Sequence, residues 1–210
     1  RYRMFALVES GSITKMMKGN KGITIGDNQY PAAIFSIWTE SERNAIGVYT
    51  VEIDTTNFKA EEWYINTNIT YAYDSSANKV KGTYGTATAK EHADTKWTQA
   101  QIDDPTLVGQ APAGADTNTV RLEGLKTQLI RVIKSQVKST LNETDWYITR
   151  KAEKSTAIPS AITTHRDAVR TKQAAMETAI TNAADTAALE TLYARDSNGD
   201  RPLGDIPTLE

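Results

Sequence analysis

The side chains that most often do chemistry are scarce in this sequence. Its 210 residues include two histidines and no cysteine, so a disulfide framework, a thiolate metal site and a cysteine nucleophile are excluded. His92 and His165 are far apart along the chain, and neither lies in the H-x-x-x-H or H-E-x-x-H spacing of a zinc site. His165 stands beside Arg166 on a predicted helix, where a solvated or capping role is the simpler interpretation. We therefore predict no metal site and no cofactor.

Two stretches invite comparison with known ion-binding loops. The segment 196–200, Asp-Ser-Asn-Gly-Asp, would place oxygen ligands at the first, third and fifth positions of a calcium loop. Arg201 then stands where such a loop must turn sharply, and Pro207 stands where a bidentate glutamate is required. The stretch 18–22, Lys-Gly-Asn-Lys-Gly, has the glycines and lysines of a phosphate loop, but no helix N-terminus follows it. We predict a terminal turn and a flexible polar loop at these two places.

Motifs of enzymes are missing from the sequence. It contains no G-x-S-x-G elbow, no P-loop and no G-x-G-x-x-G fingerprint. No pair of carboxylates stands out as placed for acid and base catalysis. We predict that the protein is not an enzyme and has no catalytic residues.

The composition is that of a folded protein with little net charge. Hydrophobic residues make up 39% of the chain, charged residues make up 24%, and the net charge is −2. No apolar run reaches the roughly 18–20 residues that a membrane-spanning helix needs. Residues 117–172 carry eleven Lys and Arg against five Asp and Glu, but aromatic residues do not alternate with these charges as in a single-strand-binding groove. We predict a solvated helix face with no nucleic-acid or membrane partner; a basic rim facing an acidic partner protein is the alternative.

Residues 1–88 are predicted to form a small β-rich domain. In residues 63–73 the odd positions hold mostly large apolar side chains and the even positions hold mostly polar ones, which is the alternation of a strand with one buried face. Turn residues at 74–78 and a second strand at 79–88 complete a predicted β-hairpin. Thr39 and Glu42 have the spacing of a capping box for a short helix that Gly47 ends. The hairpin's tyrosines are the candidate partner-binding residues: Tyr64, Tyr71, Tyr73 and Tyr84.

The middle of the chain is predicted to be a linker. Residues 89–116 contain polar stretches and a Gly, Ala and Pro spacer at 109–116, a composition that resists a packed core. The natural domain boundary falls near residue 110.

Residues 117–195 are predicted to form a bundle of three or four helices with short connections, and 196–210 to form an irregular tail. Apolar residues spaced by three or four run from Leu122 to Leu141, as on the buried face of a helix. Shorter helices are predicted to begin at 144–145 and at Asp185, and a longer one at Pro159. The fold class is therefore α+β. The residues predicted to pack the bundle are Leu125, Leu129, Ile133, Val137, Leu141, Trp146 and Val169.

The stretch Thr117–Tyr193 resembles a helical module at the C-terminal end of many bacteriophage tail-region proteins, including fibre-associated and tail-fibre-assembly-like proteins. The resemblance rests on the leading amphipathic helix, the Leu-Asn-Glu-Thr-Asp-Trp-Tyr run at 141–147 and the basic pair at 150–151. It continues through Ala-Ile-Pro at 157–159 to the Arg-Asp-Ala-Val-Arg helix at 166–170. The N-terminal half resembles a small β domain of the same kind of phage protein, through 4–9, 22–27, 30–31 and 38–39.

The resemblance implies a non-enzymatic component of a phage virion, assembled in the host cytoplasm and present in several copies beside other tail, neck or fibre proteins. It also implies that Leu141 and Trp146 lie where the first two helices meet, and that Arg166 and Arg170 brace this junction. Two other functions stay open: a fibre-assembly chaperone that leaves before the particle matures, and a tip that binds host glycans through exposed Trp and Tyr.

Overall fold

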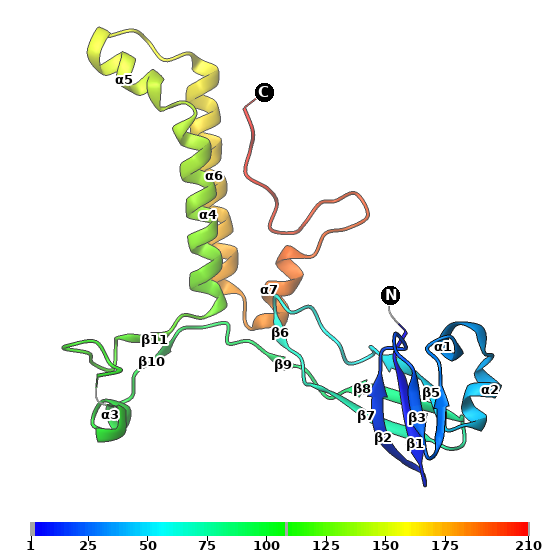
Figure 1. Cartoon of the computed structure of the whole chain (residues 1–210). Coiled ribbons are helices and arrows are strands. Elements are labelled where there is room, and N and C mark those ends of the chain that lie inside the picture. The colour runs from blue at the N-terminus through cyan, green and yellow to red at the C-terminus, as the bar shows by residue number, and fades with distance from the viewer. Residues whose placement is uncertain (1–2, 108, 210) are drawn as a thin grey trace. The chain divides into compact units, whose positions relative to one another are not determined.

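The computed structural model describes residues 3–107 and 109–209, and it divides the chain into two compact units, 1–88 and 89–210. The fold is α+β: the first unit is rich in strands and the second is rich in helices (Figure 1). The division falls at the residue where the predicted β-rich domain ends and not near residue 110, where the domain boundary was predicted. Each unit is described by itself.

The first unit is built around a five-stranded sheet with the strand order β2-β1-β5-β8-β7. Strands β5 and β8 are parallel, and the other neighbours in this sheet are antiparallel. The elements of this unit are β1 (Phe5–Glu9), β2 (Ser12–Met17), β3 (Ile23–Ile25), β4 (Asn28–Tyr30), α1 (Ile34–Ile37), α2 (Glu40–Ala45), β5 (Val48–Asp54), β6 (Tyr64–Ile65), β7 (Ile69–Asp74) and β8 (Lys79–Tyr84). Strand β9 (Thr88–Ala89) crosses the division between the units.

Both faces of the sheet are covered: α1 packs on one face, and the sheet curls until its edge strands β2 and β7 contact each other, which encloses the other face. Phe5 and Leu7 of β1 pack on one side with Ile34 and Phe35 of α1. Their neighbours Ala6 and Val8 face the other side and pack with strands β5 and β8. A strand buried on both faces explains why four successive residues of β1 are all buried.

Helix α2 has the predicted capping box. The Thr39 side chain accepts a hydrogen bond from the Glu42 N–H, and the Glu42 carboxylate accepts one from the Thr39 N–H at 2.7 Å. The Thr39 hydroxyl also donates to this carboxylate at 2.8 Å, and the two hydrogen bonds that the carboxylate accepts from Thr39 hold the pKa of Glu42 below its ordinary value. The chain leaves the helix through Gly47, whose φ of +80° is open to glycine at little cost, and the Gly47 carbonyl accepts from the Val8 N–H at 2.8 Å.

Replacing Gly47 by alanine is expected to destabilise the first unit by about 1–2 kcal/mol. The φ is positive, and an added Cβ would lie 2.8 Å from the Val8 carbonyl oxygen, so backbone would have to move. Chemical denaturation of Gly47→Ala would measure the loss, with Gly11→Ala as the control. Gly11 has a similar φ of +78° but open space around its Cβ. An equal loss of unfolding free energy in the two variants would show that the contact with the Val8 carbonyl does not contribute to the cost.

The predicted β-hairpin is present in β7 and β8, which pair in register from Ile69–Tyr84 to Asp74–Lys79. The alternation holds in β7, where Ile69, Tyr71 and Tyr73 are half-buried and the residues between them are exposed until Asp74. It fails before β7, because Trp63 and Tyr64 are both buried and Ile65 is 60% exposed. The extended strand predicted from residue 63 is therefore interrupted, and its first part forms the separate two-residue strand β6, which pairs with β9.

The segment predicted as a linker has structure of its own and belongs to the second unit. Strand β10 (Thr95–Lys96) pairs with β11 (Val120–Leu122), so residues 95–122 form a closed loop. Within it, α3 (Gln99–Ile102) starts at a Thr98–Gln101 capping box and is followed by the 3₁₀ turn Pro105–Leu107. Trp97 is buried under the Arg121 guanidinium, 5.2 Å from its ring centre. This aromatic anchor is the feature that the spacer-like composition did not predict.

Two long antiparallel helices dominate the second unit, α4 (Leu125–Asn142) and α6 (Ser160–Asn182), which lie side by side (Figure 1). The short helices α5 (Asp145–Lys154) and α7 (Thr186–Tyr193) are placed near opposite ends of this pair. The arrangement is a helical hairpin with two short appended helices, whereas a bundle of three or four helices was predicted.

The predicted apolar stripe of α4 faces α6 in part. Leu125, Ile133 and Val137 are buried, and Leu129 and Leu141 are half-buried. On α6 the buried side chains include Val169, Met176 and Ile180. Leu122 does not belong to the stripe, because the helix begins at Leu125 and Leu122 lies in β11 with 62% of its surface exposed.

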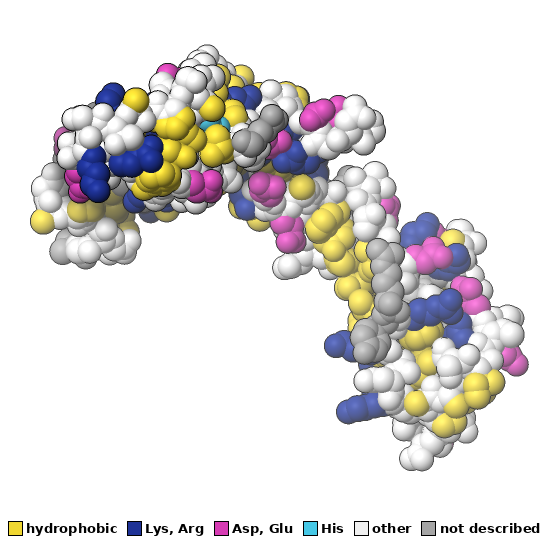
Figure 2. Space-filling model, turned by 90° about the horizontal axis from the view of Figure 1, so that it is seen from above, with side chains coloured by type: hydrophobic (Ala, Val, Ile, Leu, Met, Phe, Trp, Pro, Cys, Tyr) yellow, Lys and Arg dark blue, Asp and Glu magenta, His cyan; other side chains and the backbone are white. Residues whose placement is uncertain are grey.

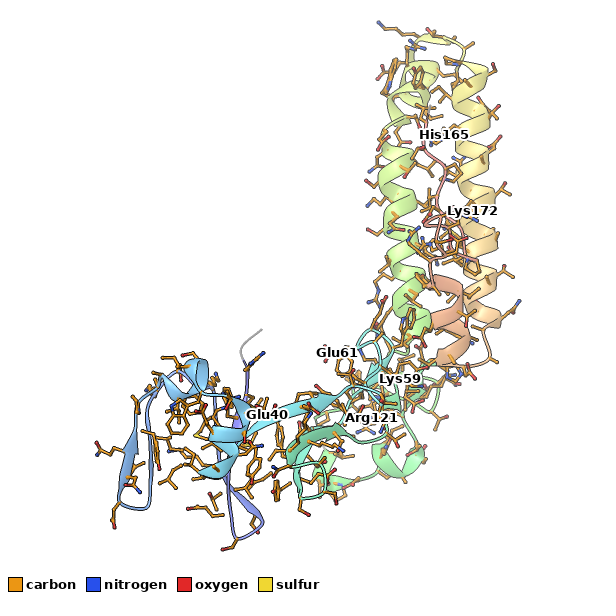
Figure 3. All side chains as sticks on the ribbon, turned by 90° about the vertical axis from the view of Figure 1, so that its right-hand side faces the viewer. Glu40, Lys59, Glu61, Arg121, His165 and Lys172 are labelled. Atoms are coloured by element: carbon orange, nitrogen blue, oxygen red, sulfur yellow. The ribbon has the colours of Figure 1, made fainter. Side chains whose placement is uncertain are left out.

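The C-terminal segment is irregular, as predicted, but it is anchored to the helices. Leu203 is buried and its N–H donates to the Leu192 carbonyl at 3.0 Å. Asp205 pairs with Arg195 and Arg201, and the hydrogen bond from Arg195 helps to keep the pKa of the Asp205 carboxyl below its ordinary value. Figure 3 shows His165 and Lys172 on α6 beside this segment. Residues 207–209 and the first turns of α6 enclose a shallow pocket that His165 lines.

Candidate interaction surface at the tip of the helical hairpin

The tip of the helical hairpin is a sharp turn between α4 and α5, and a side chain of α6 contacts this turn. Thr144 lies in this turn with only 1% of its surface exposed. Its hydroxyl donates to the Leu141 carbonyl at 3.1 Å, so one of the last carbonyls of α4 is satisfied by a side chain. The turn therefore sets the direction in which α5 leaves.

Arg166 of α6 holds the two sides of this turn together. Its Nη1 lies 2.8 Å from the Leu141 carbonyl oxygen, 2.6 Å from Thr144 Oγ1 and 2.8 Å from Asp145 Oδ1. The Arg166 side chain is 9% exposed, whereas the Asp145 side chain is 53% exposed. Arg166 thus lies at the junction implied by the phage-module resemblance. Arg170 does not, because its exposed side chain pairs with Asp167 on the same helix.

Helix α5 carries an aromatic and cationic cluster, which we call the tip cluster: Trp146, Tyr147 and Arg150. The Trp146 and Tyr147 ring centres lie 3.8 Å apart with the planes tilted by 32°. The Arg150 guanidinium carbon lies 4.7 Å from the Trp146 ring centre and 5.2 Å from that of Tyr147. Cation–π attraction fixes these three side chains against one another, so little freedom remains to be lost on binding.

Trp146 is the exposed member of the tip cluster, and α5 carries three cations, Arg150, Lys151 and Lys154, together with the carboxylates of Asp145 and Glu153. Trp146 is 52% exposed and the adjacent Ile148 is 43% exposed. Lys151 and Lys154 follow on the same helix and are exposed. Figure 2 shows hydrophobic side chains beside Lys and Arg side chains at the end of the hairpin where α5 lies. Tryptophan, tyrosine and arginine are the residues most enriched where protein interfaces gain their binding energy.

Trp146 was predicted to pack inside the bundle, and this is wrong. Helix α5 leaves the axis of α4 at the Thr144 turn, so it does not lie between α4 and α6. Trp146 is therefore exposed where the sequence predicted a buried side chain, and Leu141 at the junction is half-buried.

The four tyrosines predicted to bind a partner pack largely against other residues of the first unit. Tyr64 is buried with the Lys59 ammonium 4.3 Å from its ring centre, which contradicts an exposed role. Tyr71 and Tyr73 pack against the core of the curled sheet. Tyr84 is half-buried, and its ring lies 5.0 Å from that of Phe58. The hairpin therefore offers less free aromatic surface than its composition predicted.

Tyr49 and Tyr73 form a hydroxyl pair inside the same sheet. Their hydroxyl oxygens are hydrogen-bonded at 3.1 Å, and their ring centres lie 4.7 Å apart. The hydrogen bond to Tyr73, together with burial, raises the pKa of Tyr49 to about 12. In an unfolded chain a tyrosine has a pKa of about 10.

The Tyr49 hydroxyl is expected to make the first unit less stable as pH rises from about 10 to about 12. The folded state favours the neutral phenol, so its contribution is fully present below pH 10 and is lost as Tyr49 ionises. Denaturant midpoints at pH 9 and pH 11.5 would fall more for the wild type than for Tyr49→Phe. Lysines titrate in both proteins, so the difference isolates Tyr49; equal falls would contradict the assignment.

Within the described residues, no group of three or more His, Cys, Asp and Glu side chains could hold a metal ion. Among those same residues, no helix combines the length and the hydropathy that crossing a membrane requires. His165 is buried, and its Nε2 has no hydrogen-bond partner in the part of the chain that the structure describes.

No protein-family model, no curated protein and no solved structure matches this chain. Its surfaces therefore have to be interpreted from their own geometry.

Proposed function

We propose that this chain is a non-enzymatic structural component of a bacteriophage virion, in its tail, neck or fibre region, and that it works by docking to a neighbouring protein. The support for a virion is the resemblance of Thr117–Tyr193 to the helical module of phage tail-region proteins. The support for docking is the geometry of the second unit.

The observation that carries the docking proposal is the exposed tip cluster on a braced turn. Trp146 gives up half of its surface to solvent although a buried aromatic would stabilise the hairpin. Arg166 uses a buried charge to fix the turn that presents it. A surface that is apolar, rigid and set at the end of two long helices suits a partner's pocket.

The partner surface that fits the tip cluster is apolar at its centre and acidic at its rim. Trp146 and Ile148 supply the apolar contact, and Arg150, Lys151 and Lys154 follow on the same helix and supply positive charge beside it. Virions repeat their parts by rotational symmetry, so several copies of one tip would engage several equivalent sites. Repetition would strengthen the attachment of the whole particle beyond that of one contact.

The experiment is mass spectrometry of purified mature particles against the crude lysate, with the copy number expressed relative to the capsid protein. We expect the chain to be present in the particles at a fixed copy number that matches a tail symmetry. Presence in the lysate alone would contradict the proposal and favour an assembly chaperone that leaves before maturation. Enrichment only on added host-cell glycans would favour an adhesive tip.

A further inference from the structure

We propose that the first unit contains a binding site for a phosphate group, formed by Arg3, Lys15, Lys18 and Lys21. The bend that connects β2 to β3 is the centre of this site, which we call the basic pocket. A phosphate loop was not predicted here, because no helix follows the Lys-Gly-Asn-Lys-Gly stretch. The structure supplies a different arrangement, in which two adjoining pockets share Lys18 and Asn20.

The basic pocket is concave and of small-molecule size. One part, of about 370 Å³, is lined by residues 15–22, and the other, of about 400 Å³, is lined by Arg3, Met4, Lys18 and Asn20. These volumes lie at the lower end of the range of ligand pockets. Methionine side chains form apolar parts of the lining beside the cations. A small anion with an attached organic group fits such a mixture better than a long polyanion.

Charge is the second observation. Among the described residues, the two linings contain four cations and no carboxylate. None of the four side chains takes part in an ion pair or hydrogen bond with another residue that the structure describes. Like charges gathered without a counterion repel one another, and an oxyanion bound among them would relieve that repulsion. Lysines are common ligands of phosphate as point charges.

The backbone of the bend adds donors and rigidity. The N–H groups of residues 19–22 donate no hydrogen bond to any described residue, so they are available to an anion. Gly19 has a φ of +69°, and an added Cβ would lie 2.8 Å from the buried Phe5 ring and 3.1 Å from Phe35. The bend therefore rests directly on the core of the sheet and holds its shape without a ligand.

The lining also argues against nucleic acid. A single-stranded nucleic acid is held by exposed aromatic rings along a charged groove, and none of the described residues that line the two parts of the basic pocket is aromatic. A phosphate group on a small molecule, whether free phosphate or a sugar phosphate, has the size and charge that this site accommodates.

The test is titration of the full chain with inorganic phosphate and with glucose 6-phosphate, followed by backbone amide NMR shifts. We expect saturable shifts confined to residues 3–4 and 15–22, weakened by added sodium chloride. Lys18→Gln/Lys21→Gln should weaken binding at least tenfold. Lys151→Gln/Lys154→Gln removes the same charge from exposed sites in the second unit and should leave binding unchanged.

Equal affinity for the two ligands would assign the site to the phosphate group alone, and tighter binding of glucose 6-phosphate would assign it to a sugar phosphate. Shifts spread over lysines in both units, or equal losses in the two double variants, would overturn the proposal. So would duplex DNA that shifts residues 15–22 when neither small phosphate does. The site lies in the first unit, so its failure would leave the docking proposal for the second unit untouched.

Discussion

Replacing Trp146 by alanine is expected to weaken docking of the chain about 30-fold while changing the free energy of unfolding by less than about 1 kcal/mol. Truncating a central aromatic of an interface costs about 2 kcal/mol or more of binding, which corresponds to this factor. The small stability effect follows from the 52% exposure of Trp146, because a side chain that remains half in water loses little packing when it is removed.

The docking effect can be measured by supplying the variant during assembly and counting copies per purified particle. Val132→Ala is a matched control, since Val132 is also 52% exposed and lies on α4 of the same hairpin. The control should be incorporated as well as the wild type. If Trp146→Ala lowered the stability by the 3–5 kcal/mol typical of a buried aromatic, its exposure in the structure would be contradicted.

Replacing Arg166 by leucine is expected to destabilise the second unit by about 3 kcal/mol. The change removes the contacts to Leu141, Thr144 and Asp145 at once. Breaking one partner of a buried ion pair costs about 3–5 kcal/mol, and the lower end applies because Asp145 is half-exposed and can be solvated. The Leu141 carbonyl would keep the N–H and the hydroxyl of Thr144 as donors, whereas the buried Thr144 hydroxyl would lose the hydrogen bond that it accepts from Arg166.

Denaturation followed by circular dichroism at 222 nm would measure this loss, because the longest helices are in the second unit. Arg170→Leu provides the matched control: it lies one turn further along α6, is 52% exposed and pairs with Asp167 on its own helix. We expect the control to change stability by less than about 0.5 kcal/mol. A similar loss of unfolding free energy in both variants would show that the contacts of Arg166 at the Thr144 turn do not stabilise the second unit.

Helix positions in the second half followed from local rules that the sequence states directly. The spacing of three and four residues from Leu122 to Leu141 predicted α4, although the helix begins later, at Leu125. Asp185 was correctly expected to begin the last helix, where its side chain accepts from the Ala188 N–H at 2.8 Å. The Thr39–Glu42 capping box likewise depends only on residues three apart. Helix spacing and capping boxes can be predicted from sequence because they depend on residues three or four positions apart and not on tertiary contacts.

Burial at the tip did not follow from the sequence, because it depends on the direction of a turn. Trp146 has the size and hydrophobicity of a core residue. The contacts of Arg166 with Leu141, Thr144 and Asp145, which are distant from it in the sequence, fix the turn at which α5 leaves the hairpin. Tyr64 shows the opposite error, since its alternation predicted exposure while its neighbours enclose it. The basic pocket was missed for a similar reason: Arg3 joins the Lys18 bend only through the pairing of β1 with β2.

The most direct test of docking through the tip is site-specific photo-crosslinking in purified particles. A benzoylphenylalanine placed at Trp146 should crosslink to one virion protein other than the chain itself, and the crosslinked peptide should come from an apolar patch with acidic residues around it. The same probe at Ile37, which is 76% exposed in the first unit, should not crosslink to that peptide. Particles that contain the chain at full copy number but give no crosslink from position 146 would contradict the account.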